Sequence, residues 1–250
     1  MTDLDLLVDF HLGGVRQGPG ADDLTVRAID LSGLAPSPDL KIADMGCGTG
    51  ASTLVLAKTL GAQVTAVDLF PGFLQALEKA ARVAGVSDRV ETVQTSMDDV
   101  PFPDGSFDAI WSEGAIYSIG FATGVRAWRK FLKPNGILAV SELTWLTADR
   151  PQALTDHWTQ EYPEVDTASG KLGVLEAAGY SPIGYFPLPE RCWIDMYYRP
   201  MEDRFASFLN KHGQSDAARV LVEAERAEIA LYQRYRAYVS YGYYVARRTP

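Results

Sequence analysis

The sequence predicts an α/β fold in which helices cover both faces of one mostly parallel sheet. Short β-like runs recur from Lys41 onward at intervals of roughly 20 to 30 residues, with helical stretches between them, as βαβ units require. A glycine turn follows the first run directly. The chain has 250 residues, of which 47% are hydrophobic, so it can bury a sizeable core. We therefore expect a single domain over residues 1–250.

Residues 1–40 are predicted to form an N-terminal helical cap. Asp22 and Asp23 open the helical pattern LTVRAIDL, which stops at the proline-rich APSPD. In the cofactor-binding half, 41–142, apolar residues at helical spacing predict crossover helices over 52–60 and 73–82. Five strands are expected there, in the runs KIADM, AQVTAVDL, RVETVQ, FDAIWS and GILAVSE.

The substrate-side half, residues 143–250, is less regular. A helix is expected over 169–178 and a sixth strand after it, in GYSPIGYFPLP. Residues 202–236 place apolar side chains on one side and charges on the other, which is typical of a helix. The alternating run YVSYGYYVARR predicts a last strand, compatible with a sheet whose edge runs antiparallel. The helical insertion before it, at about 190–236, is predicted to be a lid.

Charge and cysteine content exclude several classes of protein. With 32 acidic and 23 basic residues, the chain carries a net charge of −9 and would repel a phosphate backbone, so no nucleic-acid partner is expected. Cys47 and Cys192 are too few for a disulfide framework or a thiolate metal cage. The acidic start MTDLDLLVDF does not resemble a secretory peptide, and no apolar run reaches the length of a membrane span. We expect a cytoplasmic protein without a metal site.

The run IADMGCGTG, residues 42–50, is the most informative motif. Gly46, Gly48 and Gly50 allow the backbone to turn tightly and to approach a ligand closely. Asp68 ends the second strand, where a carboxylate can accept both hydrogen bonds of a ribose diol. Together the two features indicate a nucleoside ligand.

The glycines alone also satisfy the dinucleotide pattern, so a nicotinamide-dependent oxidoreductase using NAD(P) stays open as an alternative. Asp44 favours another ligand. It lies two residues before the first glycine, where its carboxylate would repel a pyrophosphate but tolerate a cationic sulfonium. We expect Asp44 to organise the amides of the turn or to lie near the cationic ligand group.

Four motifs in order resemble the class I S-adenosylmethionine-dependent methyltransferases, closest to the small stand-alone bacterial branch that includes the ubiquinone/menaquinone-biosynthesis type. They are IADMGCGTG, Asp68, SMDDVPFPDGSFDAIWSEGAIYSIG and FLKPNGILAVSE, and they cover about residues 40–142. The resemblance implies a Rossmann-like sheet of seven strands with the last antiparallel, S-adenosylmethionine as cofactor and S-adenosylhomocysteine as product. The cofactor-binding residues that it implies are Gly46, Gly48, Gly50, Asp68, Leu69, Ser96, Met97, Asp98 and Glu113.

Methyl transfer is an in-line displacement, so no universal catalytic residue is needed, although a base helps when the acceptor must lose a proton. Glu113, at the end of the fourth strand, is the first candidate to face both cofactor and acceptor. His11 in the N-terminal cap is a second candidate base, with a surface or packing role as its alternative. Arg16, in the loop RQGPG, is expected to pair with a carboxylate of cofactor or substrate.

The methyl acceptor is expected to be a small molecule, without a membrane partner. The fourth strand lacks the Asn-Pro-Pro-Tyr pattern of enzymes that methylate amino groups of nucleobases or glutamine side chains. Aromatic side chains are candidates to enclose the acceptor, although they are equally compatible with lid packing or a homodimer contact; they are Tyr117, Trp145, Trp193, Tyr197 and Tyr198. A non-catalytic S-adenosylmethionine-binding protein stays open as a further alternative.

Overall fold

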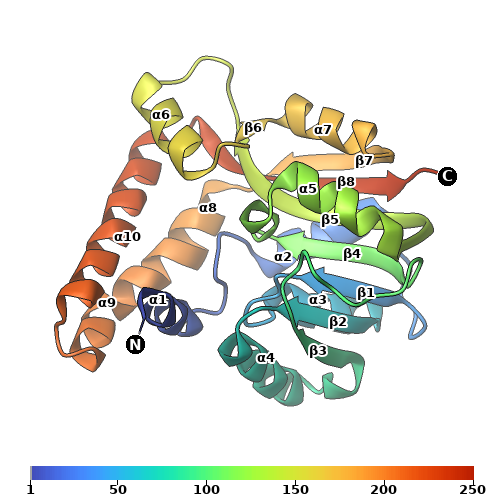
Figure 1. Cartoon of the computed structure of the whole chain (residues 1–250), viewed down its shortest axis with the longest axis horizontal. Helices are drawn as coiled ribbons and strands as arrows, with labels where there is room; N and C mark the ends of the chain where they lie inside the picture. Colours follow the sequence, from blue (N-terminus) through green and yellow to red (C-terminus); the bar gives the residue numbers. More distant parts are fainter. Residues whose placement is uncertain (1) are drawn as a thin grey trace.

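The computed structural model of the chain describes residues 2–250 and contains one mixed sheet with helices on both faces (Figure 1). The strand order is β3-β2-β1-β4-β5-β8-β7, and a short β6 pairs with β5. The strands are β1 Lys41–Met45, β2 Gln63–Asp68, β3 Val90–Gln94, β4 Phe107–Glu113, β5 Leu132–Trp145, β6 Asp166–Thr167, β7 Tyr180–Pro187 and β8 Val239–Arg248. The predicted fold class is confirmed.

Strand β8 is the predicted antiparallel strand. It pairs antiparallel with β5 on one side and with β7 on the other, while β1 to β5 pair in parallel. The antiparallel strand therefore lies one position in from the edge, which β7 forms. Strand β8 begins at the end of the sheet where β7 stops, with Pro187 opposite Gly242, so the helical excursion between them leaves and returns at one end of the sheet.

Ten helices and four short helical turns accompany the sheet in the described residues. The helices are α1 Asp3–Leu12, α2 Asp22–Ser32, α3 Ala51–Leu60, α4 Pro71–Ala84, α5 Phe121–Trp128, α6 Gln152–Glu161, α7 Ala168–Ala177, α8 Glu190–Trp193, α9 Arg199–Lys211 and α10 Asp216–Tyr235. The turns are η1 Ser87–Arg89, η2 Ile116–Ser118, η3 Arg129–Phe131 and η4 Ile194–Tyr198, the last of them π-helical.

Alternating residues of each central strand are buried in different layers. Ile42 belongs to the core shared with α2, α3 and the lid, whereas its neighbour Ala43 belongs to the core shared with α5 and α7. Strands covered on both faces read as continuous apolar runs, which is why the sequence revealed them so clearly. The first strand ends as predicted, at Met45, because the next residue is Gly46 with φ +71°.

The lid consists of α8, η4, α9 and α10, within the predicted 190–236. Its long helical region is broken at Gly213 and Gln214, which have φ values of +60° and +56° and turn the chain back (Figure 1). Ser215 then starts α10 by accepting a hydrogen bond from the amide of Ala218. Helix α1 packs against α10, so the lid and the N-terminal cap meet. Within residues 2–250, no helix combines the length and apolar content needed to cross a membrane.

Candidate cofactor and active site

A pocket of about 310 Å³ opens where β1, β2, β3 and β4 end. Its walls are the glycine turn after β1, the loops after β2 and β3, residues 113–118 after β4, and residues 16–19 of the N-terminal cap. Ligands of open parallel sheets bind at the carboxyl ends of the strands. The pocket therefore occupies the position at which the sequence motifs predict a nucleoside.

The glycines of the turn are required by this chain's own side chains. Gly46 and Gly48 line the pocket with positive φ, and a Cβ on Gly48 would overlap Oε1 of Gln17. Gly50, with φ +90°, is not among the lining residues, and a Cβ there would overlap Leu77 of α4. Gly50 thereby allows α3 and α4 to pack closely, and its expected place beneath the cofactor stays a prediction.

Asp44 anchors helix α3 from beneath the turn. Its Oδ2 accepts hydrogen bonds from Ser52 Oγ at 2.7 Å and Thr53 Oγ1 at 2.6 Å, and its side chain is fully buried. Burial raises the pKa of Asp44 to about 6. Oδ2 of Asp44 thus bonds to helix hydroxyls, while its Oδ1 has no partner within residues 2–250. The role expected for Asp44 toward the turn amides or a cationic ligand group stays a prediction.

We expect the ionisation of Asp44 to lower the free energy of unfolding as the pH rises. Its folded pKa of about 6 exceeds the unfolded value of 3.8, so the folded state binds this proton more tightly. The carboxyl therefore contributes most below the unfolded pKa and loses its contribution as the pH passes the folded pKa. At ~1.4 kcal/mol per pKa unit, the difference is about 3 kcal/mol.

Urea unfolding of wild type and Asp44→Asn at several pH values measures this difference. Relative to the variant, wild type should lose about 3 kcal/mol of unfolding free energy between about pH 3 and about pH 7. Asp39→Asn, at an exposed position, is the control and should keep the wild-type pH dependence. Parallel curves for wild type and Asp44→Asn would contradict the assignment.

Asp68 lines the pocket and bonds directly to the glycine turn. Its Oδ2 accepts the amide of Gly48 at 2.9 Å, and its Oδ1 accepts the amide of Phe70 at 3.0 Å. Burial raises the pKa of Asp68 above its ordinary value. Because each carboxylate oxygen has two acceptor positions, both oxygens keep one free for a ligand.

The adenine-side candidates divide into two groups. Leu69, Ser96 and Met97 line the pocket. Asp98 is exposed and accepts a hydrogen bond from Ser96 Oγ, which itself lines the pocket; the expected contact of Asp98 with the adenine stays a prediction. The sequence reasoning missed Phe70 and Phe73, which also line the pocket; their only signal was their place directly after Asp68.

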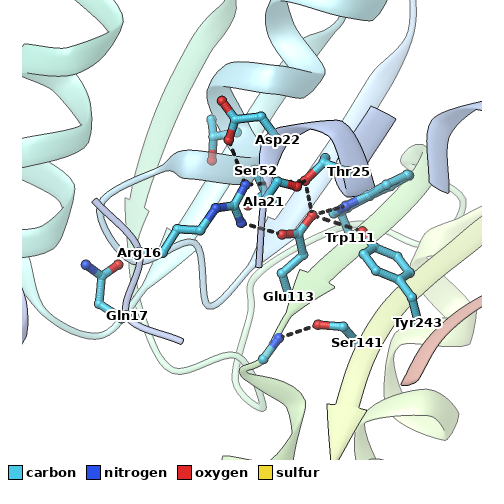
Figure 2. A network of polar contacts seen from close by, with 12 residues as sticks. Arg16, Gln17, Ala21, Asp22, Thr25, Ser52, Trp111, Glu113, Ser141 and Tyr243 are labelled. Atoms are coloured by element: carbon cyan, nitrogen blue, oxygen red, sulfur yellow. Dashed lines mark hydrogen bonds and ion pairs between the residues drawn. The ribbon is translucent and has the colours of Figure 1, made fainter. Parts of the chain in front are cut away.

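Arg16 and Glu113 form the polar centre of the site (Figure 2). Arg16 Nη1 donates to Glu113 Oε2 at 2.7 Å, and both side chains are about nine-tenths buried, with 10% and 9% exposed. Arg16 Nη2 also contacts Asp22 at 2.9 Å. The carboxylate partner of Arg16 comes from β4 of the same chain, and a further carboxylate from cofactor or substrate stays a prediction.

Glu113 joins three segments of the protein. Its Oε1 accepts hydrogen bonds from Thr25 Oγ1 at 2.6 Å, Tyr243 OH at 3.0 Å and Trp111 Nε1 at 3.2 Å, as Figure 2 shows. With Arg16 on Oε2, its acceptor positions are largely occupied. Glu113 lines the pocket, but these bonds suit it to hold the cap on β4 and β8 more than to accept a proton.

Gln17 fastens the N-terminal loop to the glycine turn. Its Oε1 accepts the amide of Thr49 at 2.8 Å, and its Nε2 donates to the carbonyl of Gly14 at 3.1 Å. Thr49 Oγ1 in turn donates to the carbonyl of Val15 at 3.0 Å. Residues 13–20, which we call the strap, thereby form one wall of the pocket, as the loop RQGPG had suggested.

Of the two remaining polar candidates, Tyr117 lies at the pocket and His11 lies outside it. Tyr117 lines the pocket from η2 and is 51% exposed. His11 does not line it: His11 Nε2 lies 3.9 Å from Glu225 Oε1 of the lid. Burial lowers the pKa of His11 to about 4, so the imidazole is neutral at neutral pH.

Most of the aromatic candidates pack the lid. Trp193 is 2% exposed, stacks on Tyr232 at 4.3 Å between ring centroids and donates to Ser240 Oγ. Tyr198 is buried beside it, and Trp145 is buried under Arg150. These three correct the expected acceptor contacts in favour of the packing alternative. Tyr197, in η4, is half-buried and packs against the core that includes the lid.

Comparisons with known proteins agree with this geometry. Residues 43–140 match the family model described as a methyltransferase domain. The 2-methyl-6-phytyl-1,4-hydroquinone methyltransferase of Synechocystis sp. is 31% identical over 192 residues, covering 68% of this chain and 58% of that protein. A demethylmenaquinone methyltransferase of Clavibacter sepedonicus is 35% identical over 124 residues, 49% of each chain. This chain thus spans about half the length of these relatives.

Among solved structures, a methyltransferase from Geobacter sulfurreducens in complex with S-adenosyl-L-homocysteine has a TM-score of 0.83. The match covers 96% of both chains at 18% sequence identity, which shows the shared fold.

Proposed function

We propose that this chain, whose residues 43–140 are a methyltransferase domain on the class I S-adenosylmethionine-dependent fold, transfers a methyl group from S-adenosylmethionine to a small molecule. The observation that carries the proposal is the Asp68 carboxylate, which lines the pocket beside the glycine turn, bonds to the Gly48 amide and keeps acceptor positions free. A ribose diol offers the two donors that such a carboxylate binds.

The pocket fits this cofactor in size and chemistry. Its volume of about 310 Å³ lies at the lower end of the range for small-molecule sites. Asp68 would bind the ribose, and Leu69, Phe70 and Met97 offer apolar contacts for the adenine. Gly46 and Gly48 would lie beneath the cofactor, with Glu113 and the strap beyond them.

When bound, the cofactor supplies an electrophilic methyl group on a sulfonium. The chain's part is to hold the acceptor about 3 Å from that carbon and to exclude water. Arg16 and Glu113 hold the strap over the pocket, and Tyr117 borders its acceptor side. Glu113 is in this proposal a positioning residue, because its acceptor positions are occupied by Thr25, Trp111, Tyr243 and Arg16.

Calorimetry and labelled methyl transfer test the proposal. We expect S-adenosylmethionine and S-adenosylhomocysteine to bind with a one-to-one stoichiometry, and NAD(H) not to bind. Incubation with methyl-labelled S-adenosylmethionine and small-molecule extracts should transfer label to a product. NAD(H) binding without S-adenosylmethionine binding would overturn the cofactor assignment; cofactor binding without transfer to any extract would favour a non-catalytic binding protein.

We further propose that the chain folds as a single domain and acts in the cytoplasm. Two observations support it: the lid and the α2 and α3 layer share one apolar core, and the free Cys47 and Cys192 are both buried. Free thiols are typical of a reducing compartment. A homodimer is the alternative to a monomer. Size-exclusion chromatography with light scattering would distinguish the two.

A further inference from the structure

A second pocket lies at the opposite end of the sheet from the candidate cofactor site. It has a volume of about 470 Å³ and is lined by the loop before β4, by α5 and η3, by Pro134 of β5 and by Arg248 of β8. Strand β4 begins at this end, and the antiparallel β8 ends here, next to the C-terminus in Figure 1. The cofactor pocket, in contrast, opens where β1 to β4 end. We call this second cavity the basic pocket.

Positive charge dominates the lining of the basic pocket. Its four cationic side chains are Arg126, Arg129, Lys130 and Arg248, and Asp104 is the one acidic residue among those that line it. No ion pair within residues 2–250 involves any of these five residues. The four cations are thus uncompensated, in a chain whose net charge is −9. A hollow lined by one sign of charge attracts ions of the opposite sign.

Backbone carbonyls hold two of the arginines in place. Arg129 Nε donates to the carbonyl of Gly179 at 3.2 Å and Nη2 to that of Thr249 at 2.8 Å, while Arg248 Nη1 donates to the carbonyl of Leu132. Gly179, with φ +83°, leaves room for this guanidinium, because a Cβ there would lie 2.7 Å from Arg129 Nε. Within residues 2–250, Arg129 Nη1 and Arg248 Nη2 have no hydrogen-bond partner, and neither is a buried atom. Both are therefore open to a ligand.

The end of helix α5 accounts for only part of this arrangement. Cations near the C-terminus of a helix interact favourably with its partial negative charge, and Arg126 lies in the last turn of α5. Arg248, however, comes from β8, at the far end of the chain. Arg129 directs two of its nitrogens to carbonyls outside its own helical segment. Stabilisation of a helix end therefore does not explain why cations from three elements line one pocket.

The chemistry of the basic pocket favours a compact anion with more than one charge. Guanidinium groups bind phosphate oxygens through paired N–H donors, and a lysine ammonium adds a point charge. Pro134 is the one lining residue with an apolar side chain, and no aromatic ring lines the pocket, so it offers little surface to a nucleobase or an acyl chain. Its volume of about 470 Å³ lies within the range of small-molecule sites.

We propose that the basic pocket binds the phosphate group of a ligand through Arg126, Arg129, Lys130 and Arg248. Such a group occurs in soluble molecules, of which pyrophosphate is the simplest probe, and in the headgroups of phospholipids. The two sources share the chemistry that the pocket recognises. The site is independent of the proposed function, because no residue lines both this pocket and the cofactor pocket.

Calorimetric titration of pyrophosphate in buffer without divalent cations provides the test. Wild type should bind it saturably below about 1 mM and at least about tenfold more tightly than acetate, a compact anion with a single charge. Arg126→Gln combined with Lys130→Gln removes two exposed charges and should weaken pyrophosphate binding at least about tenfold. Lys79→Gln combined with Arg82→Gln removes two exposed charges from α4, outside the pocket, and is the matched control that should keep wild-type affinity.

Sedimentation with lipid vesicles distinguishes the two sources of phosphate. Vesicles of phosphatidylcholine with phosphatidic acid present phosphate monoesters, and vesicles of phosphatidylcholine alone do not. Binding to the first kind that the Arg126→Gln and Lys130→Gln variant loses would assign the site to a headgroup. Pyrophosphate binding without vesicle binding would assign it to a soluble phosphate compound. Either result supports recognition of the phosphate group.

Two further measurements make the result decisive. Arg248→Gln leaves α5 intact and should also weaken pyrophosphate binding, which keeps the inference testable if the double variant unfolds. S-adenosylhomocysteine should leave the affinity for pyrophosphate unchanged, because the two pockets lie at opposite ends of the sheet. Competition between the two ligands, equal affinity for acetate, binding of neither pyrophosphate nor phosphatidic acid vesicles, or wild-type affinity in the folded variants would overturn the inference. Failure of S-adenosylhomocysteine to bind would bear on the proposed function alone.

Discussion

Replacing Asp68 with alanine should weaken S-adenosylmethionine binding well over tenfold. The carboxylate is the one charged acceptor that faces the glycine turn from the end of β2, and hydrogen bonds to a charged group contribute roughly 1.5–3 kcal/mol each. Loss of two ribose bonds therefore exceeds the ~1.4 kcal/mol that equals a tenfold change in affinity. Isothermal titration calorimetry of wild type and variant measures the effect.

Asp68 also orients its own surroundings, so a second variant is needed. Asp68→Ala loses the acceptors of the Gly48 and Phe70 amides, whereas Asp68→Asn keeps one carbonyl oxygen for either a protein or a ligand donor. The asparagine variant should show an intermediate affinity. Asp88→Asn, whose side chain is 74% exposed, is the control and should bind like wild type. A folded Asp68→Ala protein with wild-type affinity would remove the basis for the cofactor site.

The second large effect is expected at Arg16. Arg16→Met would leave Glu113 buried without its cationic partner, and breaking a buried ion pair in this way typically costs about 3–5 kcal/mol. We expect a loss of about 3 kcal/mol in the free energy of unfolding, measured by urea denaturation, and a weaker affinity for the cofactor because the strap forms a pocket wall.

A double-mutant cycle isolates the pair. Glu113→Gln in the Arg16→Met background removes the stranded charge and should restore part of the lost stability. Asp22→Asn removes the other, 74% exposed partner of Arg16 and should change stability by less than about 1 kcal/mol. Additive effects of Arg16→Met and Glu113→Gln would show that the 2.7 Å contact contributes no coupling.

The sequence predicted the features that short stretches of chain determine. The run KIADM became β1 with the predicted bounds, because an apolar run meets a glycine with positive φ. Gly61 and Gly85 end α3 and α4 in left-handed conformations, as caps require. Asp68 faces the turn because the register of β2 against β1 leaves it one residue beyond the last pair, Met45 and Val67.

Features that depend on distant segments escaped prediction. The partners of Glu113 come from residues 16, 25 and 243, and no local pattern relates these positions. Trp193 reads equally well as a pocket wall or a packed ring until α10 is placed beside it. Helix α6 lacked a regular apolar face, with Leu154 its one fully buried residue, and was not predicted. The break at 213–214 depends on two residues with positive φ.

The packing around the three glycines of the turn limits which substitutions the turn accepts. Each is matched to the reach of one side chain from another segment: Gly46 to Ala115, Gly48 to Gln17 and Gly50 to Leu77. A side chain at position 48 would have to displace the end of the Gln17 side chain and adopt a positive φ. A library that randomises the turn alone will recover glycine for reasons unrelated to the cofactor, whereas one that shortens residue 17 at the same time tests what the ligand itself demands.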